Sequence, residues 1–283
     1  ACNLASIDVA KFVQGGGLDE QALARTIRLG VVMLDDVIDV NNYVVAEIDR
    51  VCRGNRKIGL GYMGVADAMM ELGVKYDSDE GLAFADRLGA LLKENALAAG
   101  EELAKVRGSF PNWSGSTWDT HHGRAMRNAA LTTIAPTGTL SILAGCSGGI
   151  EPPFALAFYR HILGGQEMLE VNAPFAKYAR ANGIWNDELI DKLSAGRSLR
   201  EIPGISDDAK RLFVTAFDVS FEWHVRMQAA FKKHVDGAIS KTINLPQWAS
   251  PADVESAFNL AYDLGCKGVT VYRDQCRMGQ PMA

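Results

Sequence analysis

The sequence lacks the spacings by which cysteine and histidine usually mark a metal site or a disulfide framework. Its five cysteines are scattered without a C-x-x-C pair, and its five histidines follow no ligand pattern. No metal ligands are therefore predicted. An odd number of scattered cysteines is more typical of reduced thiols in the cytoplasm than of disulfides in a secreted protein. We therefore expect a cytoplasmic location.

Long apolar runs and an excess of positive charge are also missing. No apolar stretch approaches the ~20 residues that a membrane-spanning helix needs, so no membrane partner is expected. The net charge is −5 at pH 7, and no basic stripe is present to neutralise the phosphates of a nucleic acid. A nucleic-acid partner is therefore not expected, and a phosphate ligand would be held mainly by backbone N–H groups.

The composition is that of a globular protein with a sizeable core. Of the 283 residues, 48% are hydrophobic and 22% are charged. No internal repeat or low-complexity linker divides the chain, so a single domain over residues 1–283 is the simplest interpretation. Apolar, β-branched runs alternate with long helical patterns, which favours a largely parallel α/β sheet or barrel.

Two long helices are predicted from their ends and their apolar stripes. Asp19 caps the first helix, whose buried stripe consists of Leu23, Ile27, Val31, Leu34 and Ile38. Its aspartates at positions 35, 36 and 39 could suggest a carboxylate site, but the solvated face of the helix is the simpler explanation. Ser78 caps the second helix, which runs to about Arg107 and stops at Gly108.

The segment Gly59–Gly64 is a literal G-x-G-x-x-G between a short strand and a helix, which is the fingerprint of dinucleotide binding. Three features oppose that interpretation. The preceding strand is short, and Tyr62 and Met63 are bulky where a pyrophosphate would approach. The acidic residue expected ~20 positions later would fall in a turn. Tight packing of the strand against the helix is the other explanation for the glycines.

The segment Leu131–Cys146 predicts a strand, a turn and a short buried helix. An apolar, β-branched run ends at Ala135, Pro136 stops the strand, and Thr137–Thr139 form a tight turn rich in hydroxyl groups. The N-terminus of the helix would offer free N–H groups and the positive end of a dipole, which suits phosphate. An ordinary capped turn explains these residues equally well, so both interpretations stay open at this point.

Seven motifs, in the same order along the chain, resemble the large catalytic chain of ribonucleotide reductases. These motifs are Cys2–Ile7, Ile58–Gly64, Ala135–Thr139, Gly149–Pro152, His224–Gln228, Ser240–Pro246 and Gly268–Arg273. Together they extend over essentially the whole chain, and several are six or more residues long. Gly237 is a small departure, because a larger polar residue would be expected there.

The resemblance implies the adenosylcobalamin-dependent class. In the oxygen-dependent class, two adjacent tyrosines on the last strand relay a radical from a small subunit, whereas here Tyr272 is followed by Arg273. The motifs Ala135–Thr139 and His224–Gln228 are also similar to the adenosylcobalamin-dependent class. The implied cofactor is adenosylcobalamin, and the implied reductant is a dithiol protein such as thioredoxin or glutaredoxin.

The fold implied by the resemblance is the second half, about five parallel strands with helices, of a ten-stranded α/β barrel. The finger loop and the N-terminal half of the barrel would be missing from this chain, and the missing half would be its partner. The first residues are already apolar and patterned, so we expect further sequence upstream. We therefore expect the chain alone to be inactive. A homodimer is one assembly that the complete protein could form.

The resemblance also implies site residues for the reduction of ribonucleotides to 2′-deoxyribonucleotides. Cys2 matches one half of a redox-active cysteine pair, although without the family it would be read as a structural thiol. The loop that holds the substrate's phosphates is matched by Ala135, Pro136, Thr137, Gly138, Thr139, Leu140 and Ser141. Whether the substrate is a diphosphate or a triphosphate stays open. The alternatives are a nucleotide- or dinucleotide-binding protein that uses Gly59–Gly64, or a non-catalytic remnant.

Overall fold

The computed structural model describes residues 1–161 and 167–276. The strands are β1 (Leu4–Asp8), β2 (Val13–Gln14), β3 (Gly17–Leu18), β4 (Gly59–Met63), β5 (Ala157–His161), β6 (Glu167–Val171), β7 (Thr242–Leu245) and β8 (Thr270–Arg273). The α-helices are α1 (Glu20–Val40), α2 (Ala46–Asn55), α3 (Val65–Leu72), α4 (Asp79–Arg107), α5 (Thr117–Thr120), α6 (Gly138–Ala144), α7 (Ala173–Ala181), α8 (Asp187–Ser194), α9 (Asp207–Leu212), α10 (Phe221–Lys232) and α11 (Pro251–Asp263). Two 3₁₀ helices are η1 (Val9–Phe12) and η2 (Leu199–Glu201).

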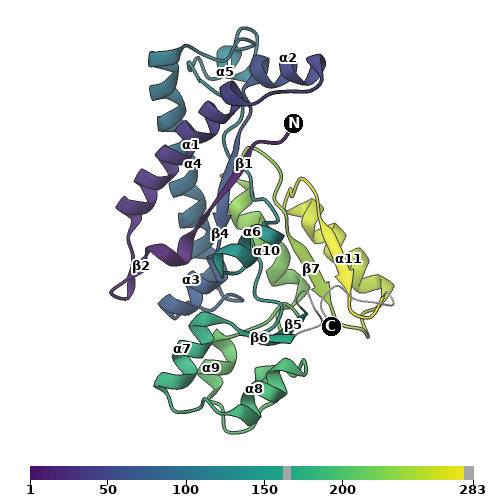
Figure 1. Cartoon of the computed structure of the whole chain (residues 1–283). Coiled ribbons are helices and arrows are strands. Elements are labelled where there is room, and N and C mark those ends of the chain that lie inside the picture. The colour runs from purple at the N-terminus through teal and green to yellow at the C-terminus, as the bar shows by residue number, and fades with distance from the viewer. Residues whose placement is uncertain (162–166, 277–283) are drawn as a thin grey trace.

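Parallel strands form the centre of this mixed α/β structure (Figure 1). β1 pairs with β4, and β7 pairs with β8, in both cases in parallel. The extended segment 131–134 lies between the two pairs, because Leu60 of β4 bridges to Thr132, and Ile134 bridges to Ile239 just before β7. The predicted strand that ends at Ala135 therefore exists as an extended segment that pairs through these bridges. The order across the sheet is β1, β4, segment 131–134, β7 and β8.

The two long predicted helices are confirmed. The side chain of Asp19 accepts a hydrogen bond from the backbone N–H of Ala22 at 2.9 Å, and all five residues of the predicted stripe are buried. Ser78 caps α4 by accepting from the N–H of Gly81, and α4 ends before Gly108 as predicted. The two helices pack against each other beside β4, and α10 packs against α4 (Figure 1).

The prediction that the aspartates of α1 face solvent is wrong for Asp35, which is completely buried. Its carboxylate accepts hydrogen bonds at 2.8–3.1 Å from the side chains of Arg56, Arg107, Arg127 and Asn128. Burial alone would raise the pKa of Asp35, but the hydrogen bonds from the arginines hold it below its usual value. Asp36 and Asp39 are about half exposed, which is consistent with the prediction for a solvated face.

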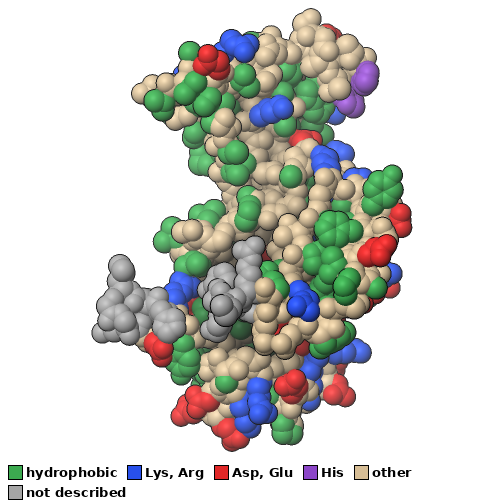
Figure 2. All heavy atoms as spheres, turned by 90° about the vertical axis from the view of Figure 1, so that its right-hand side faces the viewer, with side chains coloured by type: hydrophobic (Ala, Val, Ile, Leu, Met, Phe, Trp, Pro, Cys, Tyr) green, Lys and Arg blue, Asp and Glu red, His purple; other side chains and the backbone are tan. Residues whose placement is uncertain are grey.

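Smaller cores surround the central one. Phe175 and Phe213 pack edge to face among α7, α8 and α9, below the sheet in Figure 1. A third cluster lies between α10, β7 and α11. The face on which α11 lies, turned toward the viewer in Figure 2, carries exposed hydrophobic side chains, and the exposed aromatic residues of this region include Trp248, Phe258 and Tyr262. No helix among the described residues is both long and apolar enough to cross a bilayer.

Candidate functional site

The predicted turn after segment 131–134 is present, and its strained residue is Thr137. Thr137 is the N-cap of α6 and has left-handed backbone angles, φ 53° and ψ 25°, which are uncommon for a residue other than glycine. Its hydroxyl does not cap the helix but accepts a hydrogen bond from the backbone N–H of Gly149 at 2.8 Å. Its carbonyl accepts from the N–H of Ser141 at 2.7 Å. Neighbouring groups therefore hold the turn in a conformation that it would not adopt alone.

The open side of this turn can receive an anion. Pro136, Gly138, Thr139 and Leu140 are exposed, whereas Thr137 and Ser141 are buried. The first N–H groups of any α-helix have no partner within the helix, so those at the start of α6 are free to bind a ligand from this side. The hydroxyl of Thr139 adds one more donor at the exposed edge.

The expectation that α6 is a buried helix is wrong. Its apolar residues Leu140, Ile142 and Leu143 are 42%, 54% and 84% exposed. Ser141 is the residue of α6 that is buried, so the apolar residues of the helix lie at the surface of the described chain.

A glycine-containing segment supports the turn from behind. A Cβ atom on Gly148 would lie 3.2 Å from the carbonyl oxygen of Pro136, and one on Gly149 would lie 3.1 Å from that of Ala135. The two backbones therefore approach more closely than most side chains allow. The preceding Ser147 is tied to α3, because its N–H donates to the carboxylate of Asp67 at 2.6 Å. The turn is thus held between the sheet and α3.

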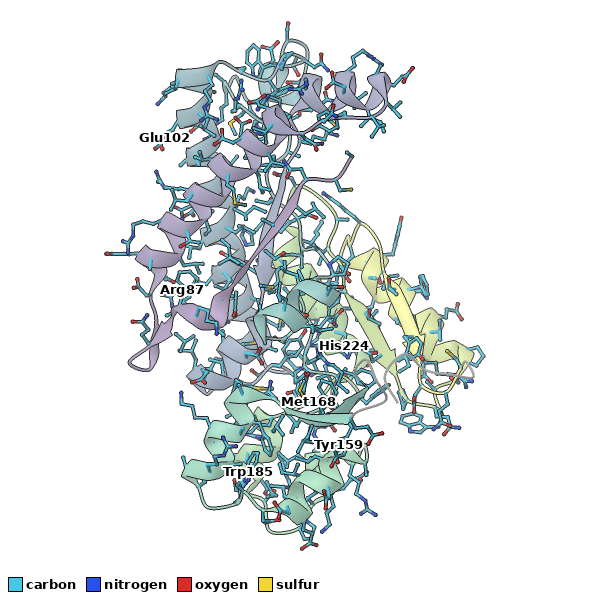
Figure 3. All side chains as sticks on the ribbon, in the orientation of Figure 1. Arg87, Glu102, Tyr159, Met168, Trp185 and His224 are labelled. Carbon is cyan, nitrogen blue, oxygen red and sulfur yellow. The ribbon has the colours of Figure 1, made fainter. Side chains whose placement is uncertain are left out.

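Behind this segment lies a buried charged cluster that the sequence motifs contain but that was not predicted as a unit. The ammonium group of Lys241 donates to a carboxylate oxygen of Glu151 at 2.5 Å, to Nδ1 of His224 at 2.6 Å and to the carbonyl oxygen of Thr242 at 2.7 Å. The signal available in the sequence was a glutamate, a lysine and a histidine, each inside one of the motifs. His224 lies in the interior of the molecule (Figure 3).

The cluster fixes the tautomer of His224. A lysine ammonium can only donate, so Nδ1 of His224 accepts, and the proton resides on Nε2, which donates to the carbonyl oxygen of Ala216 at 3.0 Å. Burial, together with the positive charge of Lys241, lowers the pKa of His224 to about 3. The burial of Lys241 also lowers its own pKa, and the carboxylate of Glu151 opposes that shift.

We expect His224 to stay neutral, with its proton on Nε2, from pH 8 down to about pH 4. Below the unfolded-state pKa of about 6.5, the unfolded chain binds a proton that the folded chain does not, so this residue removes stability as the pH falls, by up to about 1.4 kcal/mol per pH unit. Nitrogen NMR of histidine-labelled protein measures both the tautomer and the titration, with the exposed His121 and His122 as internal comparison. Titration of His224 near pH 6.5 would contradict the geometry.

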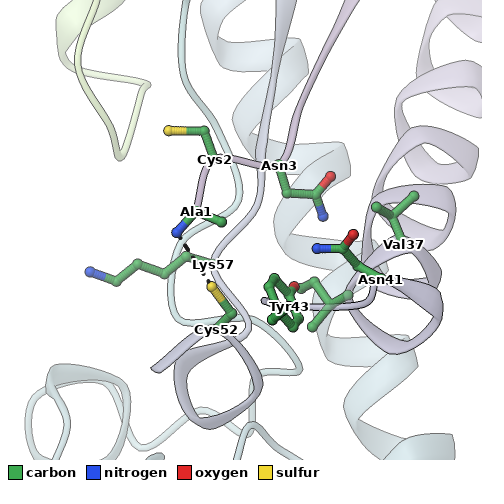
Figure 4. Close-up of a pocket in the computed structure, with 9 residues that line it drawn as sticks. Ala1, Cys2, Asn3, Val37, Asn41, Tyr43, Cys52 and Lys57 are labelled. Atoms are coloured by element: carbon green, nitrogen blue, oxygen red, sulfur yellow. Dashed lines mark hydrogen bonds between the residues drawn. The ribbon is translucent and has the colours of Figure 1, made fainter. Parts of the chain in front are cut away.

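Cys2 is exposed and lies just before β1. It lines a small pocket of about 130 Å³ whose other lining residues are Ala1, Asn3, Val37, Ile38, Asn41, Tyr43, Cys52 and Lys57 (Figure 4). Cys2 precedes the N-terminal end of its strand, whereas Thr137 follows the C-terminal end of a parallel segment. The structure therefore places the predicted redox thiol and the predicted phosphate turn at opposite ends of the sheet, and it does not bring them into one pocket.

The glycines of the G-x-G-x-x-G motif are used for packing. Gly59 and Gly61 lie inside β4, not in a turn, and every residue of β4 is buried. A Cβ on Gly61 would lie 2.0 Å from the carbonyl oxygen of Thr133 in the neighbouring segment. The glycines thus let two extended segments approach each other, where packing against a helix was expected. Only Gly64, at the start of α3, occupies a turn, and its N–H donates to the carbonyl oxygen of Ser147.

Metal ligands were not predicted from the sequence. Across residues 1–161 and 167–276, the structure has no group of three or more His, Cys, Asp or Glu side chains that could hold a metal ion.

The family model and the similar proteins all point to the same protein family. The model of the ribonucleotide reductase barrel domain matches residues 1–125 and 120–272. The vitamin B12-dependent ribonucleoside-diphosphate reductase of Thermoplasma acidophilum is 44% identical over 281 residues, which are 99% of this chain and 36% of the relative. The enzyme of the same name from Mycobacterium tuberculosis H37Rv is 41% identical over 283 residues, which are 100% of this chain and 40% of the relative.

A solved structure agrees with this family at the level of the fold. The class Id ribonucleotide reductase alpha subunit of Actinobacillus ureae superposes with a TM-score of 0.76 and 21% sequence identity, covering 97% of this chain and 50% of that chain. The chain spans about two fifths of the length of the curated relatives it matches. The chain belongs to the ribonucleotide reductase barrel-domain family.

Proposed function

We propose that this chain is the second half of the catalytic barrel of an adenosylcobalamin-dependent ribonucleotide reductase, and that it works together with the N-terminal half of that barrel. The observation that carries the proposal is the match of the barrel-domain model over nearly the whole chain. Relatives named vitamin B12-dependent reductases, at 41–44% identity, support the class. The substrate is a ribonucleotide, and the product is the corresponding 2′-deoxyribonucleotide.

The row of parallel strands supports the half-barrel part of the proposal. β1 and β8 are the two edges of this row in the described residues, and an unpaired edge is a place where another strand can add. A barrel removes such edges by closing the sheet on itself. In this proposal the other half of the barrel pairs with these edges. Pairing of two complete proteins into a homodimer is a separate part of the proposal.

The phosphate groups of the substrate bind at the turn formed by Ala135, Pro136, Thr137, Gly138, Thr139, Leu140 and Ser141 in this proposal. The chain carries a net negative charge, so neutral donors suit the role better than a basic patch. Backbone N–H groups at the start of α6 and the hydroxyl of Thr139 are such donors. The left-handed conformation of Thr137 supports the proposal, because strained residues cluster at ligand-binding sites.

Cys2 supplies reducing equivalents in this proposal. When the 2′-hydroxyl of the ribonucleotide leaves as water and hydrogen takes its place, two thiols together give two electrons and two protons and close to a disulfide. The second thiol belongs to a cysteine outside this chain. A dithiol protein such as thioredoxin or glutaredoxin then returns the disulfide to two thiols by exchange. The exposure of Cys2 is consistent with such an exchange.

The pocket lined by Cys2 does not fit adenosylcobalamin. This pocket, of about 130 Å³, is smaller than the ~300–1,000 Å³ typical of pockets for small ligands and cofactors, and a corrin is a large cofactor. We therefore assign no cobalamin contact and no cobalamin-dependent step to these residues. In the proposal, the cofactor binds mainly to the missing half and supplies the radical that starts the reaction.

Cys2→Ser in the full-length protein tests the assigned redox role. With ribonucleotide, adenosylcobalamin and a dithiol, we expect deoxynucleotide formation to fall by about 10³-fold or more, since the serine hydroxyl cannot form the disulfide. Cys276→Ser is the matched control, because Cys276 is also an exposed free thiol, and its activity should be unchanged. Undiminished turnover in Cys2→Ser would refute the redox role, and no turnover in the unmodified protein would favour a non-catalytic remnant.

A further inference from the structure

A buried cation connects β7 to the segment behind the proposed phosphate turn. The side chain of Lys241 has no exposed surface, and its three N–H groups are all used, toward Glu151, His224 and the carbonyl oxygen of Thr242. Glu151 is also held twice, because its second carboxylate oxygen accepts from the backbone N–H of Thr242 at 2.6 Å. The carboxylate is therefore fixed to both the side chain and the backbone at the start of β7.

Packing alone does not explain this arrangement. Moving an ammonium group out of water is costly, and a buried ion pair is seldom more stabilising than apolar side chains of the same volume. What such a pair gives is a defined geometry, because each partner has few alternatives. Here the pair defines where Glu151 lies relative to β7, and thereby where the backbone next to Glu151 lies.

That backbone reaches the turn within three residues. The N–H of Glu151 donates to the carbonyl oxygen of Gly148 at 2.9 Å, and the N–H of Gly149 donates to the hydroxyl of Thr137 at 2.8 Å. The hydroxyl of Tyr76 holds the intervening carbonyl of Ile150 at 2.7 Å. Displacement of Glu151 would move Gly149, and Thr137 would lose the partner of its hydroxyl.

We infer that Lys241 is a positioning residue for the phosphate groups of the substrate, and that it acts through Glu151 and Gly149 on the turn at Thr137. The inference rests on the proposed function, since it concerns the same binding turn. His224 accepts a hydrogen bond from the third N–H group of Lys241 and so helps to hold the ammonium group in place. None of these three side chains needs to touch the substrate.

Lys241→Met in the full-length reductase tests the inference. Glu151 is about one quarter exposed, so without its cation it can turn toward water and release the glycine segment. We expect KM for the ribonucleotide to rise by about 10-fold while kcat changes by less than about 3-fold. Inhibition by inorganic pyrophosphate should weaken by a similar factor, because pyrophosphate probes the turn without the ribose and base.

Two further variants separate positioning from general damage. Lys267→Met is the matched control, because Lys267 also donates to backbone carbonyls beside the sheet, and those carbonyls, of Asp236 and Gly237, lie outside the turn 135–141. Its KM should be unchanged. The double variant Lys241→Met/Glu151→Gln removes both charges, so its KM should lie closer to that of the unmodified enzyme than the KM of Lys241→Met does.

Glu151→Gln keeps the shape of the side chain and provides the test if Lys241→Met does not fold. We expect it to raise both KM and the inhibition constant of pyrophosphate by about 3-fold. An unchanged KM and pyrophosphate inhibition in a folded variant, or a loss confined to kcat, would overturn the inference. Absence of activity in the unmodified protein would instead refute the proposed function.

Discussion

Replacing Asp35 by asparagine is expected to lower the free energy of unfolding by about 3–5 kcal/mol, the range for breaking a buried ion pair from one side. The amide NH₂ would face guanidinium donors where the carboxylate now accepts. Arg56, whose side chain is only 5% exposed, would keep its charge with Asp39 as its remaining carboxylate partner. Denaturant unfolding followed by circular dichroism measures the effect.

Asp36→Asn is the control for this prediction. Asp36 is the next residue of α1, but its side chain is 52% exposed, and its ion-pair partner is Arg107. Exposed pairs contribute about 0–1 kcal/mol, so this variant should unfold almost like the unmodified protein. Equal effects of the two substitutions would show that the buried network does not act as described. Because the pKa of Asp35 is lowered, its contribution is present above pH ~4 and is lost as the pH falls below that value.

Replacing Gly61 by alanine is expected to prevent formation of the native sheet. The new Cβ would lie 2.0 Å from the carbonyl oxygen of Thr133, and both groups belong to backbone that neighbouring segments hold on each side. Relief would require the extended segments to separate, which we expect to cost more than about 4 kcal/mol. Soluble yield and the circular dichroism spectrum report the outcome.

Gly268→Ala is the matched control, because, apart from its two chain neighbours, no atom of the described residues would lie within 4 Å of a Cβ at Gly268. This substitution should leave yield and spectrum unchanged. The comparison also addresses the dinucleotide interpretation of the motif. If Gly61→Ala folded normally and lost only the ability to bind NAD, the packing role would be refuted and the dinucleotide interpretation favoured.

The long helices could be predicted because their determinants are local. Asp19 caps the N–H of Ala22, which is only three residues away in the sequence. The apolar stripe of the helix likewise repeats at the spacing of one helical turn. The error at Asp35 has the opposite cause. Its partners come from positions 56, 107, 127 and 128, and no spacing within α1 could indicate that these side chains converge on one carboxylate.

In the candidate site, too, the features set by neighbouring residues could be predicted and those set by distant residues could not. Pro136 and the residues that follow it indicated a turn and a helix start, and both are present. The direction of the hydroxyl of Thr137 depends on Gly149, twelve residues later, and could not be predicted. Whether α6 is buried depends on which other segments pack against it. The apolar pattern alone therefore wrongly predicted a buried helix. The contacts among Glu151, Lys241 and His224 appear only when β7 and α10 are placed in space.

The order of the strands also has a consequence for how the chain acquires its structure. In the row formed by β1, β4, segment 131–134, β7 and β8, each extended segment lies next to the member of the row that precedes it along the chain. A nascent chain can therefore extend the sheet in the order of synthesis, with each new strand joining the edge left by the last. Domains that fold in this direction need no later insertion of a strand between two existing ones.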